Sequence, residues 1–229
     1  MRIDFVANVS HELRTPLTAI KGYTETLQQD LEVRPGDLTA ASTKEFLGII
    51  SRNAARLMNL MEDLLDLSSI ESTTVLQKDN LGTFEITQRV VKNLQDRFLK
   101  KKQILDFSAE AKTVIADPNR LEQILTNLLD NAHKYTPEGG KISVLWEVDR
   151  NGGKDVFLKV IDSGPGISLE HQGRLFERFY RVDKARSREQ GGTGLGLAIV
   201  KHIMQRHEGA VWIESQAGKG SMFVCRFPE

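Results

Sequence analysis

Four glycines between residues 191 and 196 form the clearest candidate binding element of this sequence. The run Gly-Gly-Thr-Gly-Leu-Gly stands directly before an apolar stretch at helical spacing. Glycine lets a backbone approach a ligand where a side chain would clash, and the first turn of a helix offers unpaired N–H groups that suit phosphate. The stretch therefore predicts a polyphosphate-binding loop, although a glycine-rich helix entry without a ligand remains the alternative. Its Gly-x-Gly-x-Gly spacing differs from the dinucleotide-fold and P-loop patterns.

A second group of candidate residues is the run His-Glu-Leu-Arg-Thr-Pro at positions 11–16. The ring of His11 falls one residue beyond a helix seam, so we expect it to face solvent. Glu12 could accept the proton of one ring nitrogen and leave the other nitrogen as a nucleophile. Thr15 lies one turn further along the same face, and Pro16 should kink the helix. A surface histidine without chemistry is the alternative.

Two asparagines four residues apart, Asn127 and Asn131, should share one face of a helix. Their amide oxygens could ligate a hard cation such as Mg²⁺. Lys134 follows three residues later and could reach a phosphate. The alternative is a polar helix face that ends at a Thr-Pro stop, with His133 as a bystander.

A carboxylate follows a predicted apolar strand in the run Asp162-Ser-Gly164-Pro-Gly166. Such a carboxylate could accept a hydrogen bond from the amino group of a base while the glycine turn passes close to the ring. An ordinary turn is the alternative. Residues 175–181, Leu-Phe-Glu-Arg-Phe-Tyr-Arg, read as the aromatic and basic end of a helix that precedes the glycine run.

The elements that must position these residues begin with a helical hairpin over residues 1–70. Apolar residues step by threes and fours along both arms, as in coiled-coil seams. The first seam has Val6, Leu13, Leu17, Ile20, Leu27 and Leu31, and the second has Phe46, Ile50, Asn53, Leu57, Leu60, Leu64 and Leu67. A turn is expected at 34–37, with Ser42 or Thr43 capping the second helix. Because two helices cannot make a good core alone, we expect a homodimer with a four-helix bundle.

Residues 71–80 break the helical period and predict a linker, followed by a mixed domain over 81–229. Helices are expected at Leu81–Phe98 and from Asp117 onward, where Asp117 would be the N-cap and Pro118 the first helical residue. The expected strands are Ile104–Phe107, Thr113–Ala116, Ile142–Val148, Val156–Val160, Val211–Glu214 and Met222–Phe227. The expected fold class is α+β, with one sheet covered by helices on one face.

Composition narrows the classes of function. The chain has 229 residues, with 31 Lys+Arg and 31 Asp+Glu, which argues against bulk electrostatic binding to nucleic acid or to an anionic membrane. Hydrophobic residues make up 40% of it and charged residues 27%, as in an ordinary globular protein. No apolar run reaches membrane-spanning length. The single cysteine, Cys225, is expected to be a buried thiol in a reducing compartment.

Taken together, these clusters resemble the H, N, G1, F and G2 boxes of bacterial sensor histidine kinases of two-component signalling. All five occur in family order over nearly the whole chain. The resemblance is best to the class whose phosphorylated histidine lies within H-E-L-R-T-P, such as phosphate-regulon and cell-wall sensors. It implies a dimeric helical hairpin followed by an α/β-sandwich ATP-binding domain of the gyrase, chaperone and histidine-kinase type. It also implies the cytoplasmic portion of a membrane-anchored sensor, with no membrane contact of its own.

The resemblance implies a role for each site residue. His11 would take the γ-phosphate of ATP, Glu12 would orient and polarise it, and Thr15 would place a water that dephosphorylates the partner response regulator. Asn131 would ligate Mg²⁺ with support from Asn127. The other implied nucleotide contacts are Lys134 and Arg181 on phosphates, Tyr135 near the nucleoside, Asp162 with Gly164 and Gly166 at the adenine, and Gly192, Thr193, Gly194, Leu195 and Gly196 around the triphosphate. A lid is implied at about 182–191.

Two other functions compete with an autophosphorylating kinase. The first is an ATPase of the gyrase, chaperone or mismatch-repair kind, which would lack a donor histidine. The second is a dimeric docking module that binds a regulator but not ATP. The run at 11–16 and the paired heptads disfavour the first, and the intact nucleotide boxes disfavour the second.

Overall fold

The computed structural model describes residues 2–32, 36, 38–72, 75–149, 153–183 and 192–229, without the side chains of residues 2–5. The chain divides into two compact units. One comprises Met1–Asp66 with Asp183–Leu195, and the other comprises Leu67–Val182 with Gly196–Glu229. Each unit is described by itself. Among the described residues, no helix is both long enough and apolar enough to cross a membrane.

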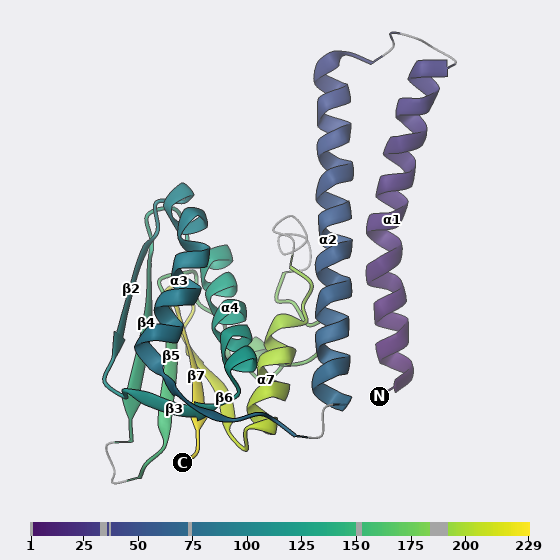
Figure 1. The fold of residues 1–229 in the computed structure, drawn as a ribbon. Coiled ribbons are helices and arrows are strands. Elements are labelled where there is room, and N and C mark those ends of the chain that lie inside the picture. The colour runs from purple at the N-terminus through teal and green to yellow at the C-terminus, as the bar shows by residue number, and fades with distance from the viewer. Residues whose placement is uncertain (1, 33–35, 37, 73–74, 150–152, 184–191) are drawn as a thin grey trace. The chain divides into compact units, whose positions relative to one another are not determined.

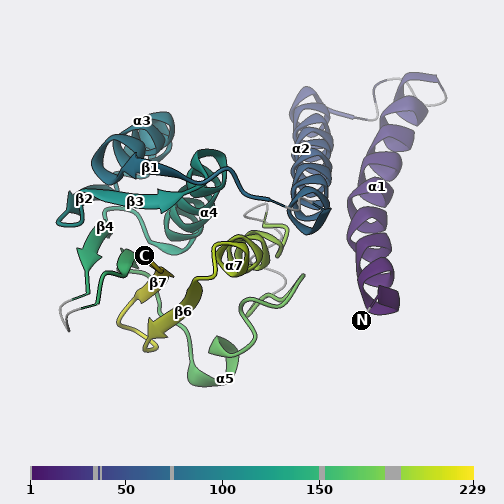
Figure 2. The same ribbon diagram turned by 60° about the horizontal axis from the view of Figure 1, so that its bottom comes forward.

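The first unit contains an antiparallel hairpin of helices α1 (Arg2–Glu32) and α2 (Ala40–Ser72), which lie side by side in both views (Figures 1 and 2). The last residues of α2, from Leu67 on, belong to the second unit. The Tyr23 and Phe46 rings meet across it with centroids 5.0 Å apart. At the turn, the Leu38 N–H donates to Asp30 Oδ1 at 2.7 Å. Several apolar side chains of this hairpin remain exposed, among them Val6, Leu17, Leu31, Met58, Met61 and Leu65.

In the second unit, the long helices of the described residues lie over a five-stranded sheet. Their bounds are α3 Thr83–Lys100, α4 Pro118–Tyr135 and α7 Gly196–Arg206. The strands are β2 Ile104–Ala109, β4 Lys141–Val148, β5 Val156–Asp162, β6 Ala210–Ser215 and β7 Ser221–Phe227. The strand order is β2-β4-β5-β7-β6, parallel between β2 and β4 and antiparallel elsewhere. The helices lie on one face of the sheet (Figure 2), which confirms the expected fold class.

Burial explains the choice of helix and sheet faces. On α4, the apolar residues Leu121, Ile124, Leu125 and Leu128 recur at helical spacing, and all are fully buried. On β4, Ile142, Val144 and Trp146 alternate inward. The Trp146 indole N–H donates to Thr87 Oγ1 at 2.8 Å, which satisfies the polar atom that burial of this ring would otherwise leave without a partner.

Several sequence expectations are corrected by the structure. Residues 81 and 82 belong to a short strand, β1 (Asp79–Gly82), which pairs with β3 (Thr113–Ala116) in a second, two-stranded sheet. The single sheet and the helix start at Leu81 were therefore wrong, because the polar segment before α3 finds its backbone partners in β3.

Two local expectations about helix ends also fail. The second helix begins at Ala40 and is preceded by Thr39, whose hydroxyl accepts from the Ser42 N–H at 3.1 Å. Thr39 therefore fills the capping place expected for Ser42 or Thr43. Residues 175–181 form turns rather than a helix end, since the helix before them, α5, spans only Leu169–Gln172.

Candidate functional site

His11 lies on the exposed surface of α1 in the helical unit. Thr15 is also exposed, and its hydroxyl donates to the backbone carbonyl of His11 at 3.2 Å. The two side chains therefore leave the helix one turn apart on the same face. Pro16 is buried within α1, which continues on both sides of it.

The neighbour of His11, Glu12, is held by an arginine of the other arm. Arg56 Nη2 donates to Glu12 Oε2 at 2.7 Å, and the two side chains are only 10% and 16% exposed. A charge-assisted contact this well sheltered from water restricts the carboxylate to one place. The sequence did not predict this contact, because Arg56 is 44 residues from Glu12 along the chain. Its only signal was its place on the second arm among the seam residues.

In the second unit, a capped helix presents the two asparagines. Asp117 Oδ1 accepts from the Asn119 and Arg120 N–H groups at 3.1 Å each, so Asp117 is the N-cap of α4 as predicted. Asn127 and Asn131 are half-buried along α4. A Cβ at Gly196 would stand 3.1 Å from Asn127 Oδ1, so the start of α7 lies directly against this side chain. The structure thus brings the asparagine face and the first residue of the glycine-preceded helix together.

Asp162 is a buried carboxylate at the end of β5, with 6% of the residue exposed. Burial raises its pKa, and hydrogen bonds from the backbone N–H groups of Gly164 and Ser221 act in the opposite direction. None of these donors is a cation. A buried carboxylate of this kind can accept a hydrogen bond from a neutral donor, such as the amino group of adenine.

The two glycines of the turn after Asp162 have no room for a side chain. A Cβ at Gly164 would stand 2.6 Å from Asp162 Oδ1 and 3.1 Å from the Tyr135 carbonyl. Gly166 has φ +66°, and a Cβ there would stand 2.0 Å from the Gln216 carbonyl. The turn is therefore packed between the end of α4 and the segment that follows β6.

Three further expected nucleotide contacts, Lys134, Tyr135 and Arg181, belong to the second unit. Lys134 and Tyr135 stand in the last turn of α4, half-buried and exposed respectively. Arg181 follows the turns after α5, and its Nε is buried.

Of the described part of the glycine run, residues 192–195 belong to the first unit, and Gly196 begins α7 in the second. Gly194 has φ +78°, and the Leu195 N–H donates to Thr193 Oγ1 at 3.3 Å. Gly192 also lies in this stretch. Most of the implied lid, 184–191, lies outside the described residues.

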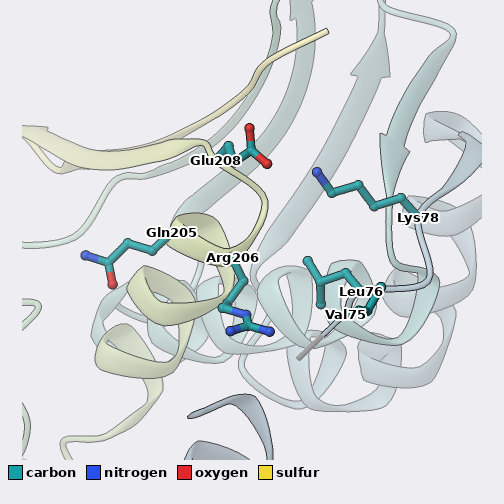
Figure 3. Close-up of a pocket in the computed structure, with 6 residues that line it drawn as sticks. All are labelled: Val75, Leu76, Lys78, Gln205, Arg206 and Glu208. Atoms are coloured by element: carbon teal, nitrogen blue, oxygen red, sulfur yellow. The ribbon is translucent and has the colours of Figure 1, made fainter. Parts of the chain in front are cut away.

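A separate cavity of about 410 Å³ lies in the second unit (Figure 3), lined by Val75, Leu76, Lys78, Gln205, Arg206 and Glu208. None of the expected nucleotide residues lines it. Between its lining residues Arg206 and Glu208 in the sequence is the buried His207. Its Nε2 accepts from the Asp117 N–H at 3.0 Å, and its Nδ1 donates to the Ile203 carbonyl at 2.9 Å. Since Nε2 must be unprotonated to accept, His207 is neutral in this arrangement.

We expect His207 to make the protein less stable in mild acid. Burial lowers its pKa, whereas the unfolded chain binds the proton at a pKa of about 6.5. The contribution of neutral His207 to the free energy of unfolding is fully present above about pH 7. It is lost as pH falls from about 6.5 towards the pKa of the folded state. The free energy of unfolding then changes by up to about 1.4 kcal/mol per pH unit, which corresponds to about one proton.

Urea unfolding of the wild type and His207→Gln at pH 7.5, 6.5 and 5.5 checks this expectation. The variant should be less stable at pH 7.5 yet lose less stability on acidification. Burial also lowers the pKa values of His133 and His202, so some slope remains in the variant. Equal slopes in both proteins would contradict the assignment.

Known proteins resemble this chain in both its N-terminal helical segment and its C-terminal α/β segment. The His Kinase A (phospho-acceptor) domain model matches residues 1–73, and the model for histidine kinase-, DNA gyrase B- and HSP90-like ATPases matches residues 116–229. The phosphate regulon sensor protein PhoR of Pseudomonas aeruginosa is 42% identical over 230 residues, which is 99% of this chain and 50% of that protein. The chain thus spans about half the length of this relative.

Solved structures agree with these matches. Histidine kinase ThkA, solved in complex with response regulator protein TrrA, aligns with a TM-score of 0.77 and 28% identity over 98% of this chain and 61% of that one. Full-length ShkA, solved with AMPPNP, aligns with a TM-score of 0.68 and 27% identity over 98% of this chain and 45% of that one.

Proposed function

This chain belongs to the sensor histidine kinase family, and from that premise we propose that it phosphorylates itself on His11 with Mg-ATP. The phosphoryl group then passes to an aspartate of a response regulator, and the same chain removes it from that regulator. One observation carries the proposal: His11 is exposed on α1 beside a carboxylate that Arg56 holds in place. A related ATPase without a phosphoacceptor would have no use for this pair.

The proposed organisation follows the boundaries expected from sequence. Residues 1–70 form the dimerisation and phosphotransfer hairpin, 71–80 the linker and 81–229 the ATP-binding domain. The exposed apolar side chains of α1 and α2 support pairing with a second copy, which would bury them in a four-helix bundle. The regulator bound to ThkA supports a receiver domain as the partner. As a sensor-kinase portion the chain would act in the cytoplasm, below a membrane-anchored sensor.

The proposed reaction is a displacement at the γ-phosphorus of ATP. A His11 ring nitrogen forms the new P–N bond, the bond to the β-phosphate oxygen breaks, and ADP leaves. Glu12 accepts the proton from the other ring nitrogen and, held by Arg56, keeps the ring oriented. Phosphoryl transfer needs positioning and charge neutralisation more than covalent help.

The nucleotide residues would supply that positioning. Asn131, with Asn127, would hold Mg²⁺, which neutralises phosphate charge when bound, since amide oxygens are hard ligands. Lys134 and Arg181 would contact phosphates. Asp162 would accept the adenine amino group beside the turn at Gly164 and Gly166, with Tyr135 near the nucleoside. Gly192, Thr193, Gly194, Leu195 and Gly196 would wrap the triphosphate.

Mass-spectrometric mapping of the phosphorylated residue after exposure to Mg-ATP tests the proposal. We expect an acid-labile, base-stable phosphate on His11. Release of free phosphate with no phosphohistidine would instead establish the related ATPase.

We expect Thr15→Ala to separate two activities. The Thr15 hydroxyl is exposed one turn from His11 and could hold a water for the regulator's acyl phosphate, but it has no part in attack by the imidazole. Autophosphorylation should stay within about twofold, while dephosphorylation of the regulator slows by about 10-fold or more, the scale of a lost hydrogen bond to the reacting water. Rates measured with purified phosphorylated regulator check this. Equal loss of both activities would show that Thr15 acts structurally.

A further inference from the structure

The segment that delivers Arg181 keeps its shape without a helix or strand. Its backbone hydrogen bonds include those from the Glu177 N–H to the Arg174 carbonyl, at 2.9 Å, and from the Tyr180 N–H to the Glu177 carbonyl, at 3.3 Å. Phe179 has φ +64°, a left-handed conformation that is unfavourable for a bulky residue. Such a backbone persists only where neighbouring contacts hold it, and it is common beside ligand sites.

The contacts that hold this turn converge on the next residue, Tyr180. Its hydroxyl is hydrogen-bonded to His171 Nδ1 at 2.8 Å. On the ring, the Arg174 guanidinium carbon lies 4.4 Å from the centroid, and Arg174 is itself paired with Glu177 at 3.2 Å. Tyr180 is therefore fixed at its hydroxyl and at its ring, immediately after the strained residue.

The contacts of Tyr180 with His171 and Arg174 are called the clamp below. At its histidine end, the clamp is attached to the sheet. His171 belongs to α5, and the next residue, Gln172, donates from Nε2 to the Ile167 carbonyl at 2.8 Å and the Ser215 carbonyl at 2.9 Å. The Ile167 N–H also donates to Ser215 Oγ at 2.9 Å. Since Ser215 ends β6, the clamp connects the turn before Arg181 to the edge of the sheet.

We propose that His171 is a positioning residue for phosphoryl transfer: by holding Tyr180 it fixes the left-handed turn at Phe179 and so keeps Arg181 aimed at the nucleotide phosphates. The inference rests on the proposed phosphate role of Arg181. Arg181 Nε is buried, so part of the side chain is enclosed by protein and not free in solvent. A guanidinium on a braced turn is already oriented before substrate arrives, which favours binding and transfer.

Nucleotide binding by matched variants tests the clamp. His171→Ala and Tyr180→Phe should each weaken binding of the Mg complex of a non-hydrolysable ATP analogue about fivefold to 10-fold, as expected for loss of one hydrogen bond. Binding of adenosine, which has no phosphates, should stay unchanged. The double variant should bind like either single variant because both remove the same bond. His171→Asn, whose Oδ1 can accept near the place of Nδ1, should recover most of the loss.

The control is Trp212→Phe, which removes an aromatic N–H donor to Glu214 on the same domain and should bind both ligands like wild type. If His171→Ala does not fold, Tyr180→Phe carries the test, since it keeps the ring on Arg174. Three outcomes would overturn the inference: wild-type affinity for the analogue, equal weakening of adenosine, or multiplicative losses in the double variant.

Arg181→Ala separates this inference from the kinase proposal. This variant should weaken binding of the ATP analogue at least as much as His171→Ala does. Unchanged affinity would overturn the role of Arg181 and the clamp with it, whereas phosphate mapped to His11 of the wild type would leave the kinase proposal standing.

Discussion

Replacing His11 by glutamine is expected to abolish the phosphohistidine while nucleotide binding persists. Glutamine is similar in size, but its amide nitrogen is not a nucleophile, so no P–N bond can form. Because His11 is exposed on α1, stability should change by no more than about 0.5 kcal/mol. Label from γ-phosphate-labelled ATP should fall by more than about 100-fold, the scale on which an essential catalytic group acts.

The other four histidines provide the internal control for that experiment. His133, His171, His202 and His207 are partly or fully buried, and His133 Nδ1 is hydrogen-bonded to Gln103 Oε1 at 2.7 Å. They should carry no phosphate in either protein. An ATP analogue should bind His11→Gln with wild-type affinity, which would place the defect in the phosphoacceptor. Label retained in the variant, or mapped to another histidine, would refute the assignment.

Local rules predicted the features that depend on neighbours in sequence. Asp117 caps α4 because a short carboxylate before Pro118 suits the first turn of a helix, whatever the rest of the chain does. The buried face of α4 likewise follows the helical spacing of its own apolar residues. Gly166 could be anticipated as a close-packed turn because only glycine adopts its conformation without strain.

Local rules could not predict the contacts between segments that are distant in sequence. The strand Asp79–Gly82 exists because it pairs with Thr113–Ala116, and nothing in its own polar residues favours a strand. Arg56 reaches Glu12 only once the hairpin has formed. His171 and Tyr180 are close in sequence, but their hydrogen bond depends on the left-handed backbone of Phe179, which is not a conformation that a bulky residue favours. The helix, strand end or turn that holds each candidate residue could therefore be predicted from sequence, whereas the distant contacts that hold it in place could not.

Asn131→Ala is expected to remove magnesium-dependent activity without unfolding the domain. Asn131 is half-buried on the face of α4 where Asn127 meets the start of α7. Loss of its amide oxygen would remove a proposed Mg²⁺ ligand and leave phosphate charge poorly neutralised, so we expect autophosphorylation to fall by about 100-fold or more. Label incorporation measured over a magnesium titration checks this.

Two further variants decide whether that loss comes from the metal. Asn119→Ala makes the same substitution on the exposed first turn of the same helix and should leave the rate unchanged, because that position lies two to three turns from the asparagine face. Asn131→Asp keeps a ligating oxygen and adds charge, so it should retain clearly more activity than the alanine variant, with a shifted magnesium dependence. If Asn131→Ala labels His11 at the wild-type rate, Asn131 is not a ligand. If alanine and aspartate are equally inactive while both bind adenosine, the amide N–H₂ group is what the site requires, and the oxygen has no essential role.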